Sequence, residues 1–359
     1  MKFIDLTTQY RSIKKEVDRA IFKVINRSDF IMGQEVKMLE EKIAKFCHTK
    51  YAVSLNSGTD ALYVALKALK IGKGDEVIVP AFTYLATAET VVLNGARPVF
   101  VDIDPKTFNI DVNEIESAIT KKTRAIIPVH LYGLMAEMNE ILRIAKKHKL
   151  KIIEDAAQAI GAEYYGKKAG SMGDVGCLSF FPTKNLGAYG DGGMLLTNNK
   201  KIAYYAAKWR IHGQYKKYYS AFIGDSSRLD TIQAAILLVK LKYLNQWTNG
   251  RIKVAKLYNS IFNNSAFKTP FVPKNTKHVF HQYSVLSKNR NNLITKCKKI
   301  GLPFMVYYPQ PLHLQKSMRY LKYKKNDFPI TEKISKSVIS FPIDYKKNNK
   351  IVTLLKKII

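Results

Sequence analysis

The stretch CLSFFPTKNLGAYGDGGMLLTN, residues 177–198, sets one lysine, Lys184, between two short apolar runs. The runs CLSFF and GMLLTN have the length and composition of buried strands, which predicts a closing strand pair. The loop between them is dense in glycine, which lets a backbone fold tightly beneath a flat ring. A lysine amine that is removed from water loses its proton readily and forms Schiff bases with aldehydes. A loop lysine is ordinarily a solvated charge, but these surroundings favour a chemical role for Lys184.

Outward from this stretch, apolar strands alternate with amphipathic helices over the first two-thirds of the chain. The strand-like runs are YAVSLN, EVIVP, PVFVDID, RAIIPVHLYG and KIIEDAAQ. Continuous apolar strands separated by helices predict a mostly parallel sheet that lies between helices. After about residue 240 the pattern changes: a long helix over residues 229–257, with a possible break, leads to HQYSVLS and FMVYYP as shorter strands. We therefore expect an α/β fold with a large domain, residues 1–240, and a smaller C-terminal α/β domain, residues 241–359.

Three further segments follow predicted strands, at the sheet edge where α/β proteins bind ligands. The run SGTD, residues 57–60, opens a helix, so its N–H groups suit a phosphate, although an ordinary helix cap is the competing interpretation. Glu154 and Asp155 end a strand, and a buried carboxylate needs a cation such as a protonated pyridine nitrogen or a structural ion-pair partner. Alternation alone does not decide which of the two points inward. Tyr84 could stack on an aromatic ring or pack in the core.

The chain has 359 residues and a formal net charge of +31. Such a charge can mark a nucleic-acid binder. The lysines, however, are spread along the whole chain and greatly outnumber the arginines, the residue type that reads bases. A solvated basic surface is therefore favoured over a nucleic-acid partner.

Targeting signals and metal spacings are missing from the sequence. The N-terminus lacks the apolar run and cleavage site of a signal peptide. No apolar run reaches about 18 residues, so neither a transmembrane helix nor a membrane partner is expected. The cysteines Cys47, Cys177 and Cys297 have no metal-ligand spacing and suit reduced thiols. We expect a cytoplasmic protein with no metal site.

Six segments, in order along nearly the whole chain, resemble the sugar aminotransferases of the DegT/DnrJ/EryC1/StrS family. They are NSGTDAL, PAFTYLATAET, IIEDAAQA, SFFPTKNLGAYGDGG, SRLDTIQAAIL and YYPQPLHLQ. These enzymes have fold type I and use pyridoxal 5'-phosphate (PLP), so the resemblance implies that Lys184 bonds the cofactor covalently. It implies Asp155 at the pyridine nitrogen, Gln158 near the ring hydroxyl and Tyr84 on the ring face. The residues that it implies for the phosphate are Gly58, Thr59 and Ser179.

The resemblance also implies residues that bind the sugar and a residue that contacts the neighbouring subunit. It implies that His212 and His313 lie near the sugar, although a lone histidine is more often structural. Family members usually carry asparagine where Ser226 stands, and that asparagine contacts the PLP phosphate of the neighbouring subunit. Serine is shorter, so its contact with the phosphate would run through water or be missing. The resemblance implies a homodimer with shared active sites, and the run PIDYKKNNK near the C-terminus departs from the family pattern.

The activity implied is a ping-pong transfer of an amino group from L-glutamate to a nucleotide-linked keto-deoxysugar. The segment SRLDTIQAAIL resembles members that aminate carbon three of the sugar. The alternative is a carbon-four aminotransferase, whose corresponding stretch often reads NYRM. A dehydratase branch carries histidine at the Schiff-base position, and Lys184 argues against it. A non-catalytic regulatory or binding protein on the same scaffold is the remaining alternative, because a fold does not fix a function.

Overall fold

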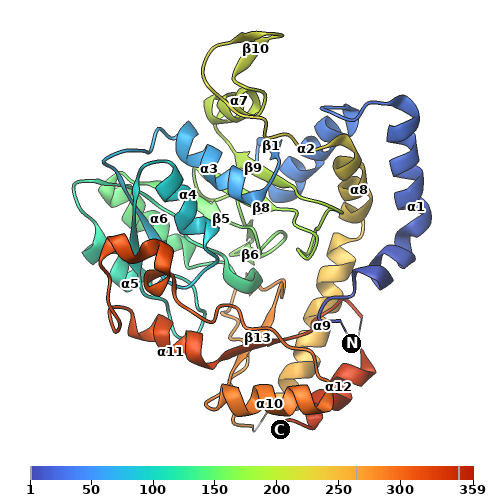
Figure 1. The fold of residues 1–359 in the computed structure, drawn as a ribbon, viewed down its shortest axis with the longest axis vertical. Helices are drawn as coiled ribbons and strands as arrows, with labels where there is room; N and C mark the ends of the chain where they lie inside the picture. Colours follow the sequence, from blue (N-terminus) through green and yellow to red (C-terminus); the bar gives the residue numbers. More distant parts are fainter. Residues whose placement is uncertain (1, 264, 347) are drawn as a thin grey trace.

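A seven-stranded sheet forms the centre of the molecule (Figure 1), in the order β1-β9-β8-β5-β4-β2-β3. The computed structural model describes residues 2–263, 265–346 and 348–359. The pairs from β8 to β3 are parallel, whereas β9 is antiparallel to both β8 and β1. The mostly parallel sheet and the closing strand pair are therefore confirmed. The strands are β1 (Tyr51–Leu55), β2 (Glu76–Pro80), β3 (Arg97–Val101), β4 (Thr123–Ile126), β5 (Lys151–Asp155), β8 (Val175–Ser179) and β9 (Gly193–Thr197).

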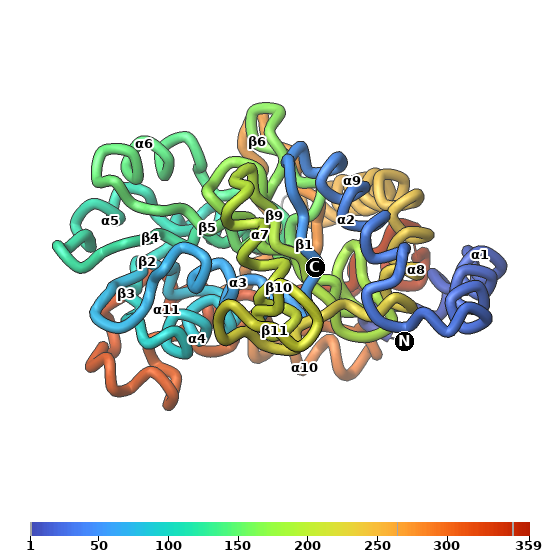
Figure 2. Tube along the Cα trace, turned by 90° about the horizontal axis from the view of Figure 1, so that it is seen from above, coloured from blue at the N-terminus to red at the C-terminus, as the bar shows by residue number. Residues whose placement is uncertain are grey.

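Helices cover both faces of the sheet; in Figure 2, α6 lies on one side and α4 on the other. Each helix buries one apolar stripe: in α6, for example, Met138, Ile141, Ile144 and Ala145 are buried at helical spacing. Each face of the sheet thereby has its own apolar cluster. One face carries α2 (Gln34–Cys47), α6 (Met138–His148) and α8 (Thr231–Leu241), and the other carries α3 (Gly58–Ala68), α4 (Ala86–Leu93) and α7 (Lys200–Trp209).

The C-terminal part builds a smaller α/β unit with its own core. Its two strands pair antiparallel, and its apolar cluster joins them to the helices around them. Residues 312–328, however, contribute Leu312 and Phe328 to the cluster of α3 and α4, so the boundary at residue 240 stays a prediction. The elements of this unit are α9 (Leu244–Phe262), β13 (Tyr283–Leu286), α10 (Arg290–Ile300), β14 (Val338–Phe341) and α12 (Asn349–Lys356).

The long helix predicted over residues 229–257, with a possible break, is two helices, because the chain bends at residues 242–243 between α8 and α9. One local expectation is wrong. The run FMVYYP is not a strand: within the described residues it makes one isolated bridge, between Met305 and Ser340. It instead lies along the small sheet and carries Tyr307 and Tyr308 toward the sheet edge of the large unit.

The remaining elements are short or peripheral. The helix α1 packs against α8. No helix among those described combines the length and the apolar character that crossing a membrane requires. These remaining elements are α1 (Leu6–Arg27), α5 (Val112–Ile115), α11 (Pro329–Ser337), β6 (Glu163–Tyr164), β7 (Lys167–Lys168), β10 (Gln214–Lys216), β11 (Tyr219–Ser220), β12 (Thr276–Lys277) and four 3-10 turns, Glu116–Ala118, Leu131–Gly133, Leu312–Leu314 and Lys316–Leu321.

Candidate active site

A cavity of about 490 Å³ opens at the carboxyl ends of the sheet strands. Its walls come from the residues at or after the ends of β1, β2, β4, β5 and β8, and from residues 281–282 and 307–308 of the C-terminal part. Parallel strands end at one edge of a sheet, so the topology brings together side chains that lie far apart in the sequence. The predicted site residues found in the wall are Gly58, Thr59, Tyr84, Asp155, Gln158, Ser179 and Lys184.

Lys184 lies in the tight loop between β8 and β9. The chain turns back directly after it, because Ala188 N–H donates to the carbonyl of Phe180 at 2.7 Å. A Cβ at Gly187 would lie 2.2 Å from the carbonyl oxygen of Pro182, so this turn requires glycine. Burial lowers the pKa of Lys184 to about 8, although the nearby Asp155 carboxylate acts in the opposite direction. About a tenth of the amine is therefore unprotonated at pH 7, and this is its nucleophilic form.

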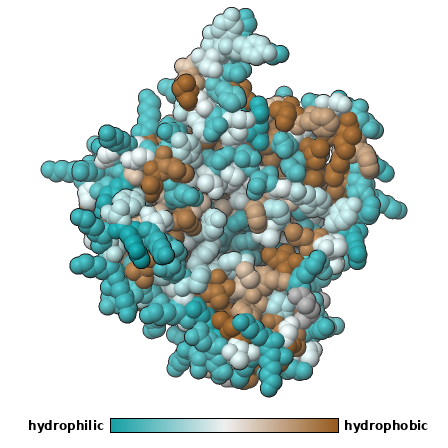
Figure 3. Space-filling model, viewed as in Figure 1, coloured by the Kyte–Doolittle hydropathy of each residue, from teal (hydrophilic) through white to brown (hydrophobic). Residues whose placement is uncertain are grey.

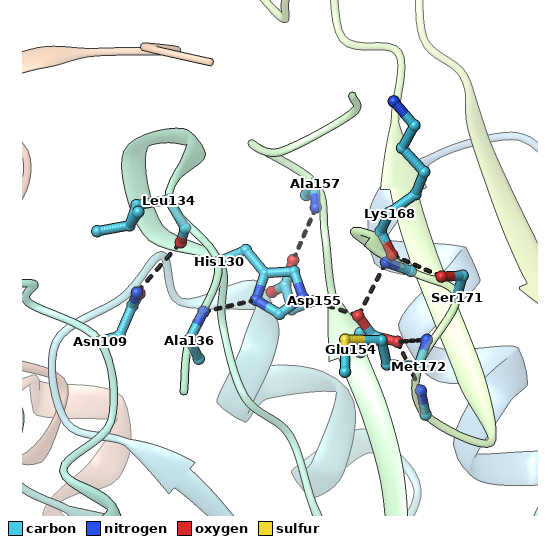
Figure 4. Close-up of polar contacts among 12 residues, drawn as sticks. Asn109, His130, Leu134, Ala136, Glu154, Asp155, Ala157, Lys168, Ser171 and Met172 are labelled. Atoms are coloured by element: carbon cyan, nitrogen blue, oxygen red, sulfur yellow. Dashed lines mark hydrogen bonds and ion pairs between the residues drawn. The ribbon is translucent and has the colours of Figure 1, made fainter. Parts of the chain in front are cut away.

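Asp155, and not Glu154, faces the cavity. One oxygen of Asp155 accepts a hydrogen bond from Thr87 Oγ1 at 2.8 Å, and the other accepts from Ala157 N–H at 3.2 Å. Glu154 is fully buried on the opposite side of the strand, where Figure 4 shows it next to His130. The distance from Glu154 Oε2 to His130 Nε2 is 2.9 Å. The residues whose backbone N–H groups donate to Glu154 are Gly170, Met172 and Gly173.

The start of α3 forms one end of the cavity. Ser57 caps the helix, with its hydroxyl oxygen accepting a hydrogen bond from Asp60 N–H at 3.0 Å. A Cβ at Gly58 would lie 2.7 Å from Ser179 Cβ, so glycine allows the helix to begin close against the end of β8. Thr59 and Ser179 bring hydroxyl groups to the same end. The free N–H groups of a helix start, next to hydroxyls, are suited to an anion such as phosphate.

Gln158 and a group of tyrosines line the side of the cavity that lies toward the C-terminal part. The amide oxygen of Gln158 accepts from Tyr132 N–H at 2.8 Å, and its amide nitrogen donates to the hydroxyl of Tyr308 at 3.0 Å. Burial raises the pKa of Tyr308, so its hydroxyl keeps its proton. The ring of Tyr84 lies 6.2 Å from that of Tyr308, and Tyr84 is 61% exposed. Exposure leaves its face free to stack on a ligand ring.

Three predicted site residues lie outside the cavity of the single chain. His212 is exposed beside the β10–β11 hairpin. His313 is buried, and its Nε2 lies 3.2 Å from Glu332 Oε1. Ser226 is exposed, and its hydroxyl accepts a hydrogen bond from Arg228 at 2.8 Å. Contacts of these residues with substrate or with a second subunit stay predictions.

The model of the DegT/DnrJ/EryC1/StrS aminotransferase family matches residues 11–354, almost the whole chain. The chain belongs to this family. It is an aminotransferase, and its cofactor is PLP.

Similar curated relatives carry both regulatory and catalytic names. A "pleiotropic regulatory protein" of Geobacillus stearothermophilus is 48% identical, over 95% of this chain and 92% of its own. A UDP-2-acetamido-2-deoxy-3-oxo-D-glucuronate aminotransferase of Pseudomonas aeruginosa is 44% identical, over 96% and 95%. A UDP-N-acetyl-3-dehydro-α-D-glucosamine 3-aminotransferase of Acidithiobacillus ferrooxidans is 41% identical, over 95% and 92%.

Two solved structures have the same fold as this aminotransferase over nearly all of its length. DesV of Streptomyces venezuelae, in complex with a ketimine intermediate, has a TM-score of 0.96 and 36% identity, with 99% of this chain and 96% of that chain covered. A Bacillus subtilis protein with the bound cofactor PMP has a TM-score of 0.91 and 32% identity, with 97% and 81% covered. The predicted fold class is therefore confirmed.

The residues of this aminotransferase fit PLP at both ends of the cavity. The glycine and hydroxyl groups at the start of α3 suit its phosphate, and Asp155 suits its pyridine nitrogen. Lys184, with its lowered pKa, suits its aldehyde. These assignments are proposals drawn from the chemistry of the wall.

The sequence interpretation missed three residues of this site. Thr87 binds Asp155, Tyr308 binds Gln158, and His281 lines the wall. Thr87 and Tyr308 lie inside segments that carry the family resemblance, so those segments were the signal that could have found them. His281 follows no predicted strand end, so nothing in its local sequence marks it.

Proposed function

We propose that this aminotransferase moves an amino group from L-glutamate to carbon three of a nucleotide-linked keto-deoxysugar, by a ping-pong mechanism. The observation that carries the proposal is a partly buried, readily deprotonated Lys184 in one cavity with the Asp155 carboxylate. The names of the Pseudomonas and Acidithiobacillus relatives, a 3-oxo and a 3-dehydro sugar aminotransferase, support the sugar and the carbon. A single cavity suits a ping-pong order, because the keto acid formed from the amino donor leaves before the sugar enters the same place.

Bound PLP supplies an electron sink for the carbon that loses or gains a proton. Lys184 Nζ would take the proton from the donor Cα and return one to carbon three of the sugar. Asp155, held by Thr87 and Ala157, would keep a negative charge opposite the pyridine nitrogen. Tyr84 would cover one ring face and help to exclude water.

A regulatory function is the second candidate, because the 48% identical relative from Geobacillus is named a pleiotropic regulatory protein. A regulator without catalysis has no need for a lysine of lowered pKa beside a carboxylate. We therefore favour catalysis, and an absorbance spectrum separates the two candidates. A visible band that bleaches on addition of L-glutamate supports transamination, whereas a protein without that response supports regulation.

We further propose a homodimer. Large apolar side chains gather on and between α1 and α2 (Figure 3), and they are exposed in the single chain. Contiguous exposed apolar side chains commonly mark an interface. Light scattering on the purified protein would measure a mass near twice the 40.9 kDa of the chain; a monomer would contradict the proposal. The residues of this surface are Phe22, Ile25, Phe30, Ile31, Met32 and Met38.

The substrate is tested with a panel of UDP- and dTDP-linked 3-keto and 4-keto sugars, each incubated with L-glutamate. Mass spectrometry would detect an amino sugar, and NMR would locate its nitrogen. Amination at carbon three supports the proposal, and amination at carbon four would move it to the alternative. Failure of every sugar, with L-glutamate also unreactive, would reject transamination.

We also propose a cytoplasmic location. The three cysteines are buried and unpaired, which suits a reducing compartment.

A further inference from the structure

His281 is a wall residue of the cavity whose hydrogen-bonding capacity is unused. The side chain is 7% exposed and lines the same cavity as Lys184. Its Nδ1 is buried and has no hydrogen-bond partner among the described residues. Buried polar atoms are almost always paired in folded proteins, so His281 is a wall residue whose ring is not fully satisfied by the protein itself.

The backbone that presents His281 is held in an uncommon conformation. Phe280, directly before it, has φ of 47°, in the left-handed region that bulky residues rarely adopt. His278 stabilises this turn, because its Nδ1 accepts from Phe280 N–H at 2.9 Å and the two rings stack with centroids 4.0 Å apart. Strained backbone of this kind gathers at functional sites.

The same segment is tied to the loop of Lys184. The amide of Asn185 donates to the carbonyl of Val279 at 3.0 Å, and Val279 N–H donates to the carbonyl of Gly133 at 2.9 Å. The segment that leads to His281 is therefore tied directly to the residue that follows Lys184.

The imidazole of His281 is neutral. Burial, together with the positive charges of Lys184 and Arg251, holds its pKa well below the ordinary value. A neutral imidazole has one N–H donor and one acceptor nitrogen, which suit an uncharged oxygen of a ligand. Among the described wall residues the one cation is Lys184, which PLP would engage, so the carboxylates of an amino donor find no other cation in this wall.

We propose that His281 binds the keto-sugar, through a hydrogen bond between its neutral ring and a hydroxyl or carbonyl oxygen beside the carbon that reacts. This inference rests on the proposed function and adds a residue that determines acceptor binding. It leaves the binding of the amino donor to other groups.

The test separates the two half-reactions by absorbance. L-glutamate bleaches the visible band of the cofactor-loaded protein, and the keto-sugar identified by the panel restores it. In His281→Leu we expect the sugar concentration for half-maximal restoration to rise about tenfold, the worth of one hydrogen bond. Bleaching by L-glutamate should change less than twofold. His281→Asn, which keeps a donor and an acceptor, should lie closer to wild type than His281→Leu.

His148→Leu, at the end of α6 and outside the cavity wall, is the matched control and should leave both half-reactions unchanged. An unchanged sugar response in His281→Leu, or a loss confined to the L-glutamate step, would overturn the inference while leaving transamination intact. If wild type aminates no sugar of the panel, the proposed function fails and the inference fails with it. Should His281→Leu not fold, as judged by its melting curve, His281→Phe gives the same comparison.

Discussion

Glu154 and Asp155 are consecutive residues of β5, yet their carboxylates have different surroundings on opposite sides of the strand. Glu154 is fully buried and accepts hydrogen bonds from three backbone N–H groups, with His130 at 2.9 Å. Asp155 faces the cavity and has Thr87 and Ala157 as donors. The two acids therefore have different roles. Glu154 holds the loop after β7 in place, whereas Asp155 is available to a ligand.

Replacing Glu154 should destabilise the fold. In Glu154→Gln an amide N–H₂ group replaces one acceptor oxygen, so buried N–H groups that donate to Glu154 lose their partner. We expect the free energy of unfolding to fall by about 3 kcal/mol, measured by urea denaturation. Glu163→Gln is the control, because Glu163 pairs with Lys168 in a partly exposed place and should lose less than about 1 kcal/mol. Equal losses in the two variants would contradict this account of Glu154.

Thr87 should act on the cofactor through Asp155. Thr87→Val keeps the shape of the side chain but removes the hydrogen bond of 2.8 Å to the carboxylate. We expect the dissociation constant of PLP to rise about tenfold, because a hydrogen bond to a charged group is lost. Fluorescence titration of cofactor-free protein gives the value. Thr90→Val, a buried change on the same helix without contact to Asp155, should leave it unaltered; a rise of similar size there would show a general effect of α4.

The reaction of Lys184 with PLP should depend on pH in a defined way. Its pKa is lowered to about 8, and the unprotonated amine is the form that attacks. In cofactor-free protein the rate of adduct formation should rise about tenfold per pH unit below pH 8 and level off above it. Stopped-flow absorbance records this profile. A rate that keeps rising to about pH 10.5, as for an ordinary lysine, would contradict the environment assigned to Lys184.

Lys240, on α8, contacts the loop between β8 and β9 that carries Lys184. It is 1% exposed, its ammonium donates to the carbonyl of Gly187, and it lies 4.9 Å from the centre of the Tyr189 ring. Burial lowers its pKa to about 8 from 10.5, so the unfolded chain binds more protons than the folded one between these values. The free energy of unfolding of wild type, minus that of Lys240→Met, should therefore rise with pH between these two values, by up to about 3 kcal/mol.

Urea denaturation of wild type and Lys240→Met at pH 7.5 and pH 10 makes this comparison. Other titrating groups are common to both proteins, so they cancel in the difference. A difference in stability that stays constant between the two pH values would show that Lys240 titrates as an ordinary lysine.

The sequence predicts the sheet well, because buried parallel strands leave a clear apolar signal. It predicts less of the C-terminal part, where FMVYYP is apolar enough for a strand but makes one isolated bridge in the described structure. Alternation could not choose between Glu154 and Asp155, because both are buried and each has a partner that is distant in the sequence, His130 for Glu154 and Thr87 for Asp155. His281 escaped detection because its place depends on the left-handed turn at Phe280 and on the tie from Asn185, which are tertiary features.

One lysine among the many of this basic chain, Lys184, should bond the cofactor. Borohydride reduction of the PLP-loaded protein fixes such a bond, and peptide mass spectrometry then locates it. We expect a single phosphopyridoxyl group on the peptide that contains Lys184, and none on that peptide in Lys184→Ala. A label on another lysine, or no label at all, would contradict it.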